Sequence, residues 1–124
     1  MGAFISGKYG VTMGNGCSLS PGAKIFTATD NVNVDMLANP QLTDTYAETG
    51  PVHVGAFSVI GANSVVLPKA WIGDEVQVAC LSMVKGTIPH NEVWGGIPAR
   101  KLGRRAKLDR SRMMGYQIPF NTGA

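Results

Sequence analysis

Apolar residues recur at every sixth position through the second half of the chain. Six consecutive units of six residues open on Val or Ile, and Gly or Ala follows the opening residue in four of them. A small or aliphatic residue holds the fifth place of every unit. A fixed short period of this kind predicts a solenoid, in which each repeat is one structural unit. The opening residues are Val54, Ile60, Val66, Ile72, Val78 and Val84, and the fifth places are held by Ser58, Ser64, Ala70, Val76, Ser82 and Ile88.

The first third of the chain carries a weaker copy of the same pattern. Aliphatic or Met residues again lie six apart, and small residues again hold the fifth place. When this frame is extended towards the N-terminus, Ile5 and Val11 fall in fifth places and Gly7 becomes an unusual opening residue. The opening residues of this copy are Met13, Leu19 and Ile25, and its fifth places are held by Cys17, Ala23 and Thr29.

The six-residue unit predicts the architecture because one short strand cannot bury an apolar face alone. Such units must stack on one another, and three of them make a triangular coil of about 18 residues. Successive coils then lie about 4.8 Å apart, as neighbouring strands do. We expect the Gly or Ala after each opening residue to permit the bend between two faces. The pattern therefore predicts an all-β fold, a parallel β-helix built as a hexapeptide-repeat solenoid of about four coils.

The repeat is interrupted once and ends before the C-terminus. Asn39-Pro40 and Gly50-Pro51 signal turns in the interrupting segment, which shows no register of six. A loop thrown out from a rigid scaffold often carries binding groups. Near the other end, Lys101 to Met114 predicts a short basic helix. We predict one domain over residues 1–124, with repeats over 1–30 and 54–89, an excursion loop over 31–53 and a C-terminal extension over 90–124.

Composition narrows the class of protein. A hydrophobic fraction of 44% with 15% charged residues excludes a disordered chain. No apolar run approaches the roughly 20 residues that span a bilayer, and no signal-peptide pattern opens the chain. Without an export signal, Cys17 and Cys80 are expected to be reduced thiols rather than a disulfide. We therefore expect a cytoplasmic protein that does not enter a membrane.

The net charge of +3 is concentrated near the C-terminus. Seven of the eleven basic residues lie between Arg100 and Arg112. Such a cluster favours an anionic cofactor, a nucleic acid or simply a solvated tail. Proteins that bind single strands place aromatic residues among the basic ones, and no aromatic residue lies within this cluster. Nucleic-acid binding therefore ranks last among these interpretations.

The second repeat block and the run Trp94-Gly-Gly-Ile-Pro-Ala-Arg-Lys101 resemble the hexapeptide-repeat acyltransferases. The segment Ile25-Phe-Thr-Ala-Thr-Asp30, followed by Leu37-Ala-Asn-Pro40 and Gly50-Pro-Val52, looks like the enzymes that acetylate sugars in bacterial polysaccharides. The maltose and xenobiotic acetyltransferases are similar as well. The likeness covers about residues 5–108. It implies a left-handed β-helix, a homotrimer with active sites between neighbouring prisms, and acetyl-CoA as co-substrate with no metal required.

The resemblance also implies a catalytic base, and here the sequence departs from the family. The family places a histidine just after the Thr-Ala segment to take the proton of the acceptor hydroxyl, whereas this chain has Asp30 there. A carboxylate is the weaker base unless burial raises its pKa. His53 lies at the other end of the excursion loop and would lie close to Asp30 if the loop leaves and rejoins at one corner. We predict His53 as the base and Asp30 as its orienting partner or as a sugar ligand.

Each of these predictions has a simpler structural alternative. His53 could be an outward strand residue whose ring is satisfied by water, and Asp30 could be a turn residue bonding local amides. We expect His90 to be a surface loop residue, because two distant histidines without a third ligand do not make a metal site.

For coenzyme A, the resemblance points to the groove beside the last coils. Ser82 and its neighbouring backbone match positions that line the pantetheine arm, while Lys85, Arg100 and Lys101 would meet the phosphates. The alternatives are a small repeat residue for Ser82 and solvated surface cations for the other three.

The sequence as a whole predicts an enzyme that moves acetyl from acetyl-CoA to a hydroxyl of a sugar or polysaccharide precursor. Two alternatives stay open. One is an enzyme that acetylates the amino group of a nucleotide-linked sugar, and the other is a non-catalytic trimeric β-helix that has lost the family histidine.

Overall fold

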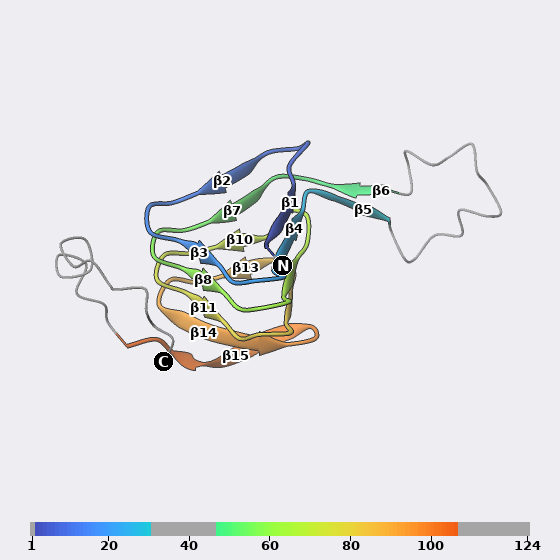
Figure 1. The fold of residues 1–124 in the computed structure, drawn as a ribbon. Coiled ribbons are helices and arrows are strands. Elements are labelled where there is room, and N and C mark those ends of the chain that lie inside the picture. The colour runs from blue at the N-terminus through green and yellow to red at the C-terminus, as the bar shows by residue number, and fades with distance from the viewer. Residues whose placement is uncertain (1, 31–46, 107–124) are drawn as a thin grey trace.

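The chain folds into a three-sided column of parallel strands, seen in a computed structural model that describes residues 2–30 and 47–106 (Figure 1). Each pass around the column adds one strand to each of three sheets. Sheet A contains β1 (Phe4–Ser6), β4 (Lys24–Phe26), β9 (Val65–Val66) and β12 (Met83–Val84). Sheet B contains β2 (Val11–Met13), β7 (Val52–Val54), β10 (Trp71–Ile72) and β13 (Thr87–Ile88). Sheet C contains β3 (Ser18–Leu19), β8 (Val59–Ile60), β11 (Gln77–Val78), β14 (Glu92–Gly96) and β15 (Ala99–Arg104).

Two further strands, β5 (Ala28–Asp30) and β6 (Ala47–Thr49), form an antiparallel hairpin that projects from the column (Figure 1). Within the described residues the fold is all-β, as the sequence predicted. No helix in this part of the chain is long and apolar enough to cross a bilayer.

The opening residues of the repeat stack in register and form the core. In sheet A, Ile25 pairs with Val66, and Val66 lies beside Val84. All three side chains are fully or almost fully buried. Equivalent columns of aliphatic residues run down sheets B and C. The period of six therefore identifies the inward-facing positions because each coil brings one opening residue from each sheet to the axis.

Three positions were assigned to the wrong place in the repeat. Thr29 pairs with Glu48 in the projecting hairpin, so it does not hold a fifth place in the column. The other two are opening residues. Ile88 pairs with Ile72, so it is an opening residue rather than a fifth-place residue. It follows Val84 by only four positions because the last corner between sheets A and B is two residues shorter than the one before it. Ile5 pairs with Ile25 and is also an opening residue, since the corner that follows β1 is longer than usual.

The serines in fifth places join one coil to the next. The Ser58 hydroxyl donates to the Gly73 carbonyl oxygen at 2.6 Å and accepts from the Val76 amide at 3.0 Å. The Ser64 hydroxyl makes the same two kinds of bond, to Ala79 and from Ser82. A buried corner leaves backbone groups that need partners, and a hydroxyl can serve as donor and acceptor at once. These small residues therefore do more than fill space.

The glycines after the opening residues are needed for stacking rather than for bending. A Cβ on Gly61 would meet the Val78 carbonyl oxygen at 2.6 Å, and one on Gly55 would overlap the Gly73 backbone of the next coil. The left-handed backbone conformation falls instead on the fourth place of the first five units of the second block. Phe57, Asn63, Lys69, Glu75 and Leu81 take φ values of 58°, 56°, 69°, 56° and 58° there. The expected reason for the glycines was wrong, because the bend is made two positions later.

The C-terminal part of the column ends in an antiparallel pair, β14 with β15. Residues 101–104 lie in β15, so the predicted helix from Lys101 is wrong over these residues, and its remainder beyond residue 106 lies outside the described residues. Local helix propensity gives way because the open edge of β14 offers backbone partners. Arg105 then fixes the end of β15, donating to the carbonyl oxygens of Phe57 at 2.7 Å and Val76 at 3.2 Å.

Candidate functional site

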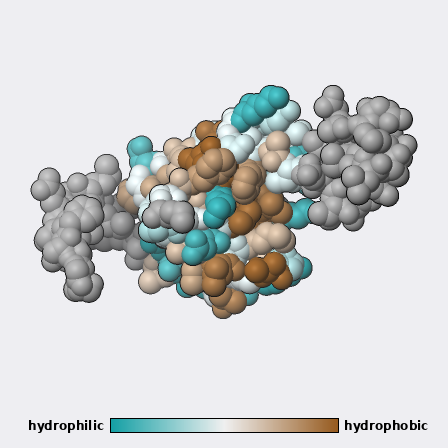
Figure 2. Space-filling view, turned by 45° about the vertical axis from the view of Figure 1, so that its right-hand side comes forward, coloured by the Kyte–Doolittle hydropathy of each residue, from teal (hydrophilic) through white to brown (hydrophobic). Residues whose placement is uncertain are grey.

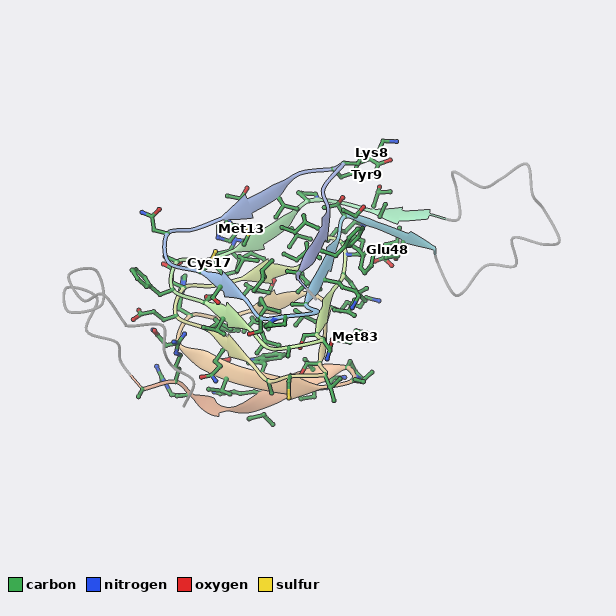
Figure 3. All side chains as sticks on the ribbon, in the orientation of Figure 1. Lys8, Tyr9, Met13, Cys17, Glu48 and Met83 are labelled. Carbon is green, nitrogen blue, oxygen red and sulfur yellow. The ribbon has the colours of Figure 1, made fainter. Side chains whose placement is uncertain are left out.

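The excursion loop leaves and rejoins the column at one corner, between sheets A and B. The Gly50 amide donates to the Thr27 carbonyl oxygen at 3.0 Å and closes the base of the hairpin. Thr27 is fully buried, and its hydroxyl donates to the Ser6 carbonyl oxygen at 2.8 Å and accepts from the Tyr9 amide at 3.2 Å. Figure 3 shows Lys8 and Tyr9 above this departure point. Thr27 thus ties the first coil to the second where the hairpin begins.

Asp30 and His53 lie on different elements near this corner. Asp30 ends β5 and pairs through its backbone with Ala47 of β6, and its side chain is outside the described part. His53 lies in the middle of β7, three residues after Gly50, and is partly exposed on the outer side of sheet B. The expected contact between carboxylate and imidazole therefore stays a prediction.

His53 opens onto a groove on the outer face of sheet B. The groove has a volume of about 380 Å³. In the register of the sheet His53 lies between Thr12 of β2 and Trp71 of β10. Its imidazole stacks on the Trp71 indole, with the ring centroids 5.3 Å apart and the planes at 18°. The groove is lined by Thr12, Pro51, Val52, His53, Lys69, Ala70 and Trp71.

The groove combines an imidazole with a cation. Among the described residues no hydrogen-bond partner is found for the His53 ring, and the Asp30 side chain lies outside them. Lys69 supplies the positive charge, and its aliphatic stem packs so closely on Gly50 that a Cβ there would overlap it. Chemically, the site offers proton transfer by His53 and charge neutralisation by Lys69.

Sequence reasoning missed Trp71 and Lys69 as groove residues. The signal was present, because His53 and Trp71 are one coil of 18 residues apart and must therefore stack in register. The period had been used to find the core, although it also predicts which outward residues are neighbours.

His90 is anchored at the next corner of the column. Its Nδ1 accepts the Asp74 amide at 2.7 Å, which requires Nδ1 to be unprotonated and leaves the proton of a neutral ring on Nε2. The same ring contacts Trp71 edge-on, with centroids 5.4 Å apart and planes at 77°. His90 is exposed, as expected for a surface residue, but its ring is held in place.

The predicted coenzyme A residues all belong to the last coil and the hairpin that follows it. The Ser82 side chain is 2% exposed, and its hydroxyl donates to the Ala79 carbonyl oxygen at 2.7 Å and accepts from the Gly96 amide at 3.1 Å. Its hydroxyl is thus engaged in holding β14, which leaves its backbone as the part that could line a ligand. Lys85 is exposed at the corner between β12 and β13, a different corner from that of Ser82.

The two remaining cations lie on the outer strand β15. Arg100 is exposed and donates to the carbonyl oxygen of Ala99 at 3.1 Å. The Lys101 ammonium lies 3.3 Å from a carboxylate oxygen of Glu92. Arg100 is therefore the cation with fewer protein contacts, whereas Lys101 is partly neutralised.

Glu92 makes the β14–β15 hairpin sensitive to acid. A hydrogen bond from Trp94 Nε1 at 2.9 Å is the main cause that lowers its pKa, with Lys101 adding to the effect. Because the folded-state pKa lies below that of the unfolded chain, the stabilisation is complete above the ordinary glutamate value of about 4.3 and disappears as the pH falls through the folded value.

We expect Glu92→Gln to lower the midpoint of thermal unfolding at neutral pH, and the difference from wild type to shrink below about pH 4. Thermal unfolding followed by circular dichroism at both pH values measures this. Trp94→Phe removes the main cause of the shift, so in that background Glu92→Gln should have a smaller effect. An equal effect in both backgrounds would contradict the assigned cause.

No protein-family model matches the sequence. The dTDP-4-amino-4,6-dideoxy-D-glucose acyltransferase of Escherichia coli is 29% identical over 105 residues, which are 83% of this chain and 55% of that protein. WbbJ of Escherichia coli K12, provisionally named an O-acetyl transferase of lipopolysaccharide biosynthesis, is 42% identical over 53 residues, which are 43% of this chain and 27% of that protein.

A solved structure resembles the column closely. AntD, an N-acyltransferase from Bacillus cereus in complex with dTDP and 3-hydroxybutyryl-CoA, superposes with a TM-score of 0.75 and 27% identity over 90% of this chain and 58% of that one. The resemblance to sugar acyltransferases is therefore confirmed. These two relatives match most of this chain, but the chain spans little more than half of their length.

Proposed function

We propose that this protein transfers an acyl group from a coenzyme A thioester to a sugar. The observation that carries the proposal is the histidine groove of sheet B, set on a column that superposes on AntD over 90% of the chain. A base that faces an open groove, with a cation beside it, suits the activation of a polar acceptor. The favoured donor is acetyl-CoA, and the favoured acceptor is a hydroxyl of a sugar or polysaccharide precursor.

The reaction proceeds by direct transfer. His53 takes the proton of the acceptor, the acceptor atom attacks the thioester carbonyl, and the carbon–sulfur bond breaks to give the acylated sugar and the coenzyme A thiol. Asp30 orients His53 or holds the sugar. A covalent enzyme intermediate is not required, and the cysteines suit that role poorly. Burial raises the pKa of the Cys17 thiol, and Cys80 has no general base next to it in sequence.

The donor occupies the groove beside the last coil. Arg100, Lys85 and Lys101 meet its phosphates, and the backbone around Ser82 lines the pantetheine arm. Arg100 is suited to this task because its guanidinium is exposed and, within the described part of the chain, bonds only to the neighbouring Ala99 carbonyl oxygen. Because the expected active sites lie between neighbouring columns of the trimer, the donor on one column meets the acceptor held in the His53 groove of the next.

The assembly is a homotrimer of left-handed β-helices in the cytoplasm. Apolar residues gather on the side of the column shown in Figure 2. Leu81 is 64% exposed and Trp71 39% exposed, which favours burial against a neighbouring column. A neighbour beside sheet B would also deepen the groove. Both cysteines are free, as expected in a reducing compartment.

A second acceptor is supported by a specific observation. The Escherichia coli relative that matches 83% of this chain is named for an amino sugar, and AntD is named an N-acyltransferase. Transfer to the amino group of a nucleotide-linked sugar is therefore the alternative, and it uses the same base and the same groove.

Calorimetry with acetyl-CoA, followed by an assay of thiol release, tests the proposal. We expect saturable binding of acetyl-CoA and thiol release that depends on an acceptor. Parallel reactions with hydroxyl sugars and with dTDP-4-amino-4,6-dideoxyglucose distinguish the two acceptors. No binding at millimolar acetyl-CoA would contradict the proposal and favour a non-catalytic β-helical scaffold.

A further inference from the structure

We infer that Trp71 is a positioning residue for His53, a role that rests on the proposed function. Trp71 does not need to touch the reacting atoms for this role. It fixes the plane of the His53 imidazole. It also favours the imidazolium that forms when His53 takes the proton of the acceptor.

The register of sheet B brings His53 and Trp71 together. His53 and Trp71 are directly opposite one another in the parallel strands β7 and β10. The strand spacing of about 4.8 Å brings two flat side chains at such positions into face-to-face contact. The observed centroid distance of 5.3 Å and interplanar angle of 18° are those of a stack. The imidazole is therefore held parallel to the indole.

No hydrogen bond from the described part of the chain orients the His53 ring. A catalytic histidine usually has one nitrogen held by a third group, which aims the other at the substrate. His53 has no such hydrogen bond among the described residues, whereas His90 has one from the Asp74 amide. Among the described residues, ring stacking is thus what fixes the plane of the imidazole, and it leaves the ring nitrogens of His53 available to the acceptor and to Asp30.

Trp71 is itself held by a second ring contact. The His90 ring meets it edge-on at 5.4 Å and 77°, and the Asp74 amide fixes the His90 ring. Trp71 is nevertheless 39% exposed, so burial in the core does not explain its position. The series Asp74, His90, Trp71 and His53 forms a connected row from the corner of the column to the groove.

The contact with Trp71 also affects the proton that His53 takes from the acceptor. When His53 accepts the proton of the acceptor, its ring becomes an imidazolium that lies over the indole face. The negative face of an indole attracts a cation placed on it. Lys69 lines the same groove and opposes this charge, so the contact with Trp71 offsets part of that repulsion. The stack therefore favours the state in which the acceptor has lost its proton.

Steady-state kinetics of Trp71→Leu and Trp71→Phe test the role. We expect Trp71→Leu to lower kcat by about tenfold to a hundredfold, the cost of a mispositioned catalytic group, with the Kd of acetyl-CoA unchanged. Trp71→Phe keeps a ring for His53 to stack on and should recover most of the lost kcat. Thr87→Ala removes the neighbour of Trp71 on the opposite side from His53 and serves as the matched control. A Trp71→Leu protein with wild-type kcat would overturn the role.

A second measurement tests the stack without turnover. The chain has two tryptophans, so Trp94→Phe leaves Trp71 as the only indole emitter. Histidine is the side chain that ordinarily gains charge between about pH 8 and about pH 5, and a protonated imidazole in ring contact quenches indole fluorescence. We expect acid quenching in the Trp94→Phe protein and a clearly smaller effect when His53→Gln is added. His90→Gln measures the share that comes from the edge contact.

The outcomes separate the two proposals. Quenching that does not depend on His53 overturns the stack and therefore the positioning role. A wild-type protein that binds acetyl-CoA but acylates no sugar overturns the proposed function, and the positioning role with it, even when the quenching is present. Acyl transfer at wild-type kcat in the Trp71→Leu protein overturns the positioning role alone.

Discussion

Replacement of His53 by Asn is expected to lower kcat for acyl transfer by about 100-fold to 10,000-fold, the usual contribution of a positioned general base. Asn keeps a polar side chain on β7 but cannot take up the proton of the acceptor. The Kd of acetyl-CoA should not change, because the predicted donor residues lie on the last coil and on β15. Thiol release measured against acceptor concentration, together with calorimetry, separates the two effects.

Asp30→Asn is the companion variant for this experiment. If Asp30 orients His53, the double variant should be no slower than His53→Asn alone, because groups that act as a unit are not additive. If Asp30 holds the sugar instead, Asp30→Asn should raise KM for the acceptor and add to the loss in kcat/KM. A His53→Asn protein with normal folding and undiminished kcat would remove His53 from the mechanism.

The largest effect on stability is expected at Gly55. A Cβ at this position would overlap the carbonyl group of Gly73 and lie 2.5 Å from a carboxylate oxygen of Asp74. The Gly73 backbone cannot withdraw, because hydrogen bonds hold the two coils together; the Gly55 amide itself donates to the Ile72 carbonyl oxygen at 2.8 Å. We expect Gly55→Ala to cost about 3 kcal/mol or more of unfolding free energy, at or above the upper end of ordinary overpacking.

Urea denaturation measures this cost, and Gly103→Ala is the matched control. A Cβ on Gly103 in β15 would meet no atom within 4 Å, and its φ lies outside the left-handed region. That variant should stay within about 0.5 kcal/mol of wild type, as exposed substitutions usually do. Equal midpoints for the two variants would show that coil spacing is not what selects glycine after the opening residue.

The repeat could be predicted from the sequence because the same burial requirement acts on every coil. Every unit must present one aliphatic residue to the axis, so spacing alone identifies Val66, Ile72 and Val78 as core residues. The same reasoning placed Ser58 and Ser64 in the interior, although it assigned them only the task of filling space. The turn position stayed hidden, because Phe57 and Glu75 share no chemistry that signals a left-handed backbone.

The candidate site could be predicted only in part. His53 was identified by its position at the end of the excursion loop, but Trp71 and Lys69 were not, although both line its groove. Ser82 was selected by resemblance, and the structure turns its side chain inward to the Gly96 amide. Which way a side chain faces depends on its place in the six-residue unit. Ser82 holds a fifth place, so the sequence already predicted that its side chain would face inward.

What the sequence by itself determined is the parallel β-helix and most of its core, because a period of six imposes the same burial on every coil. The tertiary structure decided everything that depends on the length of an individual corner. The short corner before Ile88 shifts the last coil by two residues, and pairing with β14 turns residues 101–104 into a strand. Contacts between coils join residues some 16, 18 or 41 positions apart, so each change in corner length alters which side chains meet.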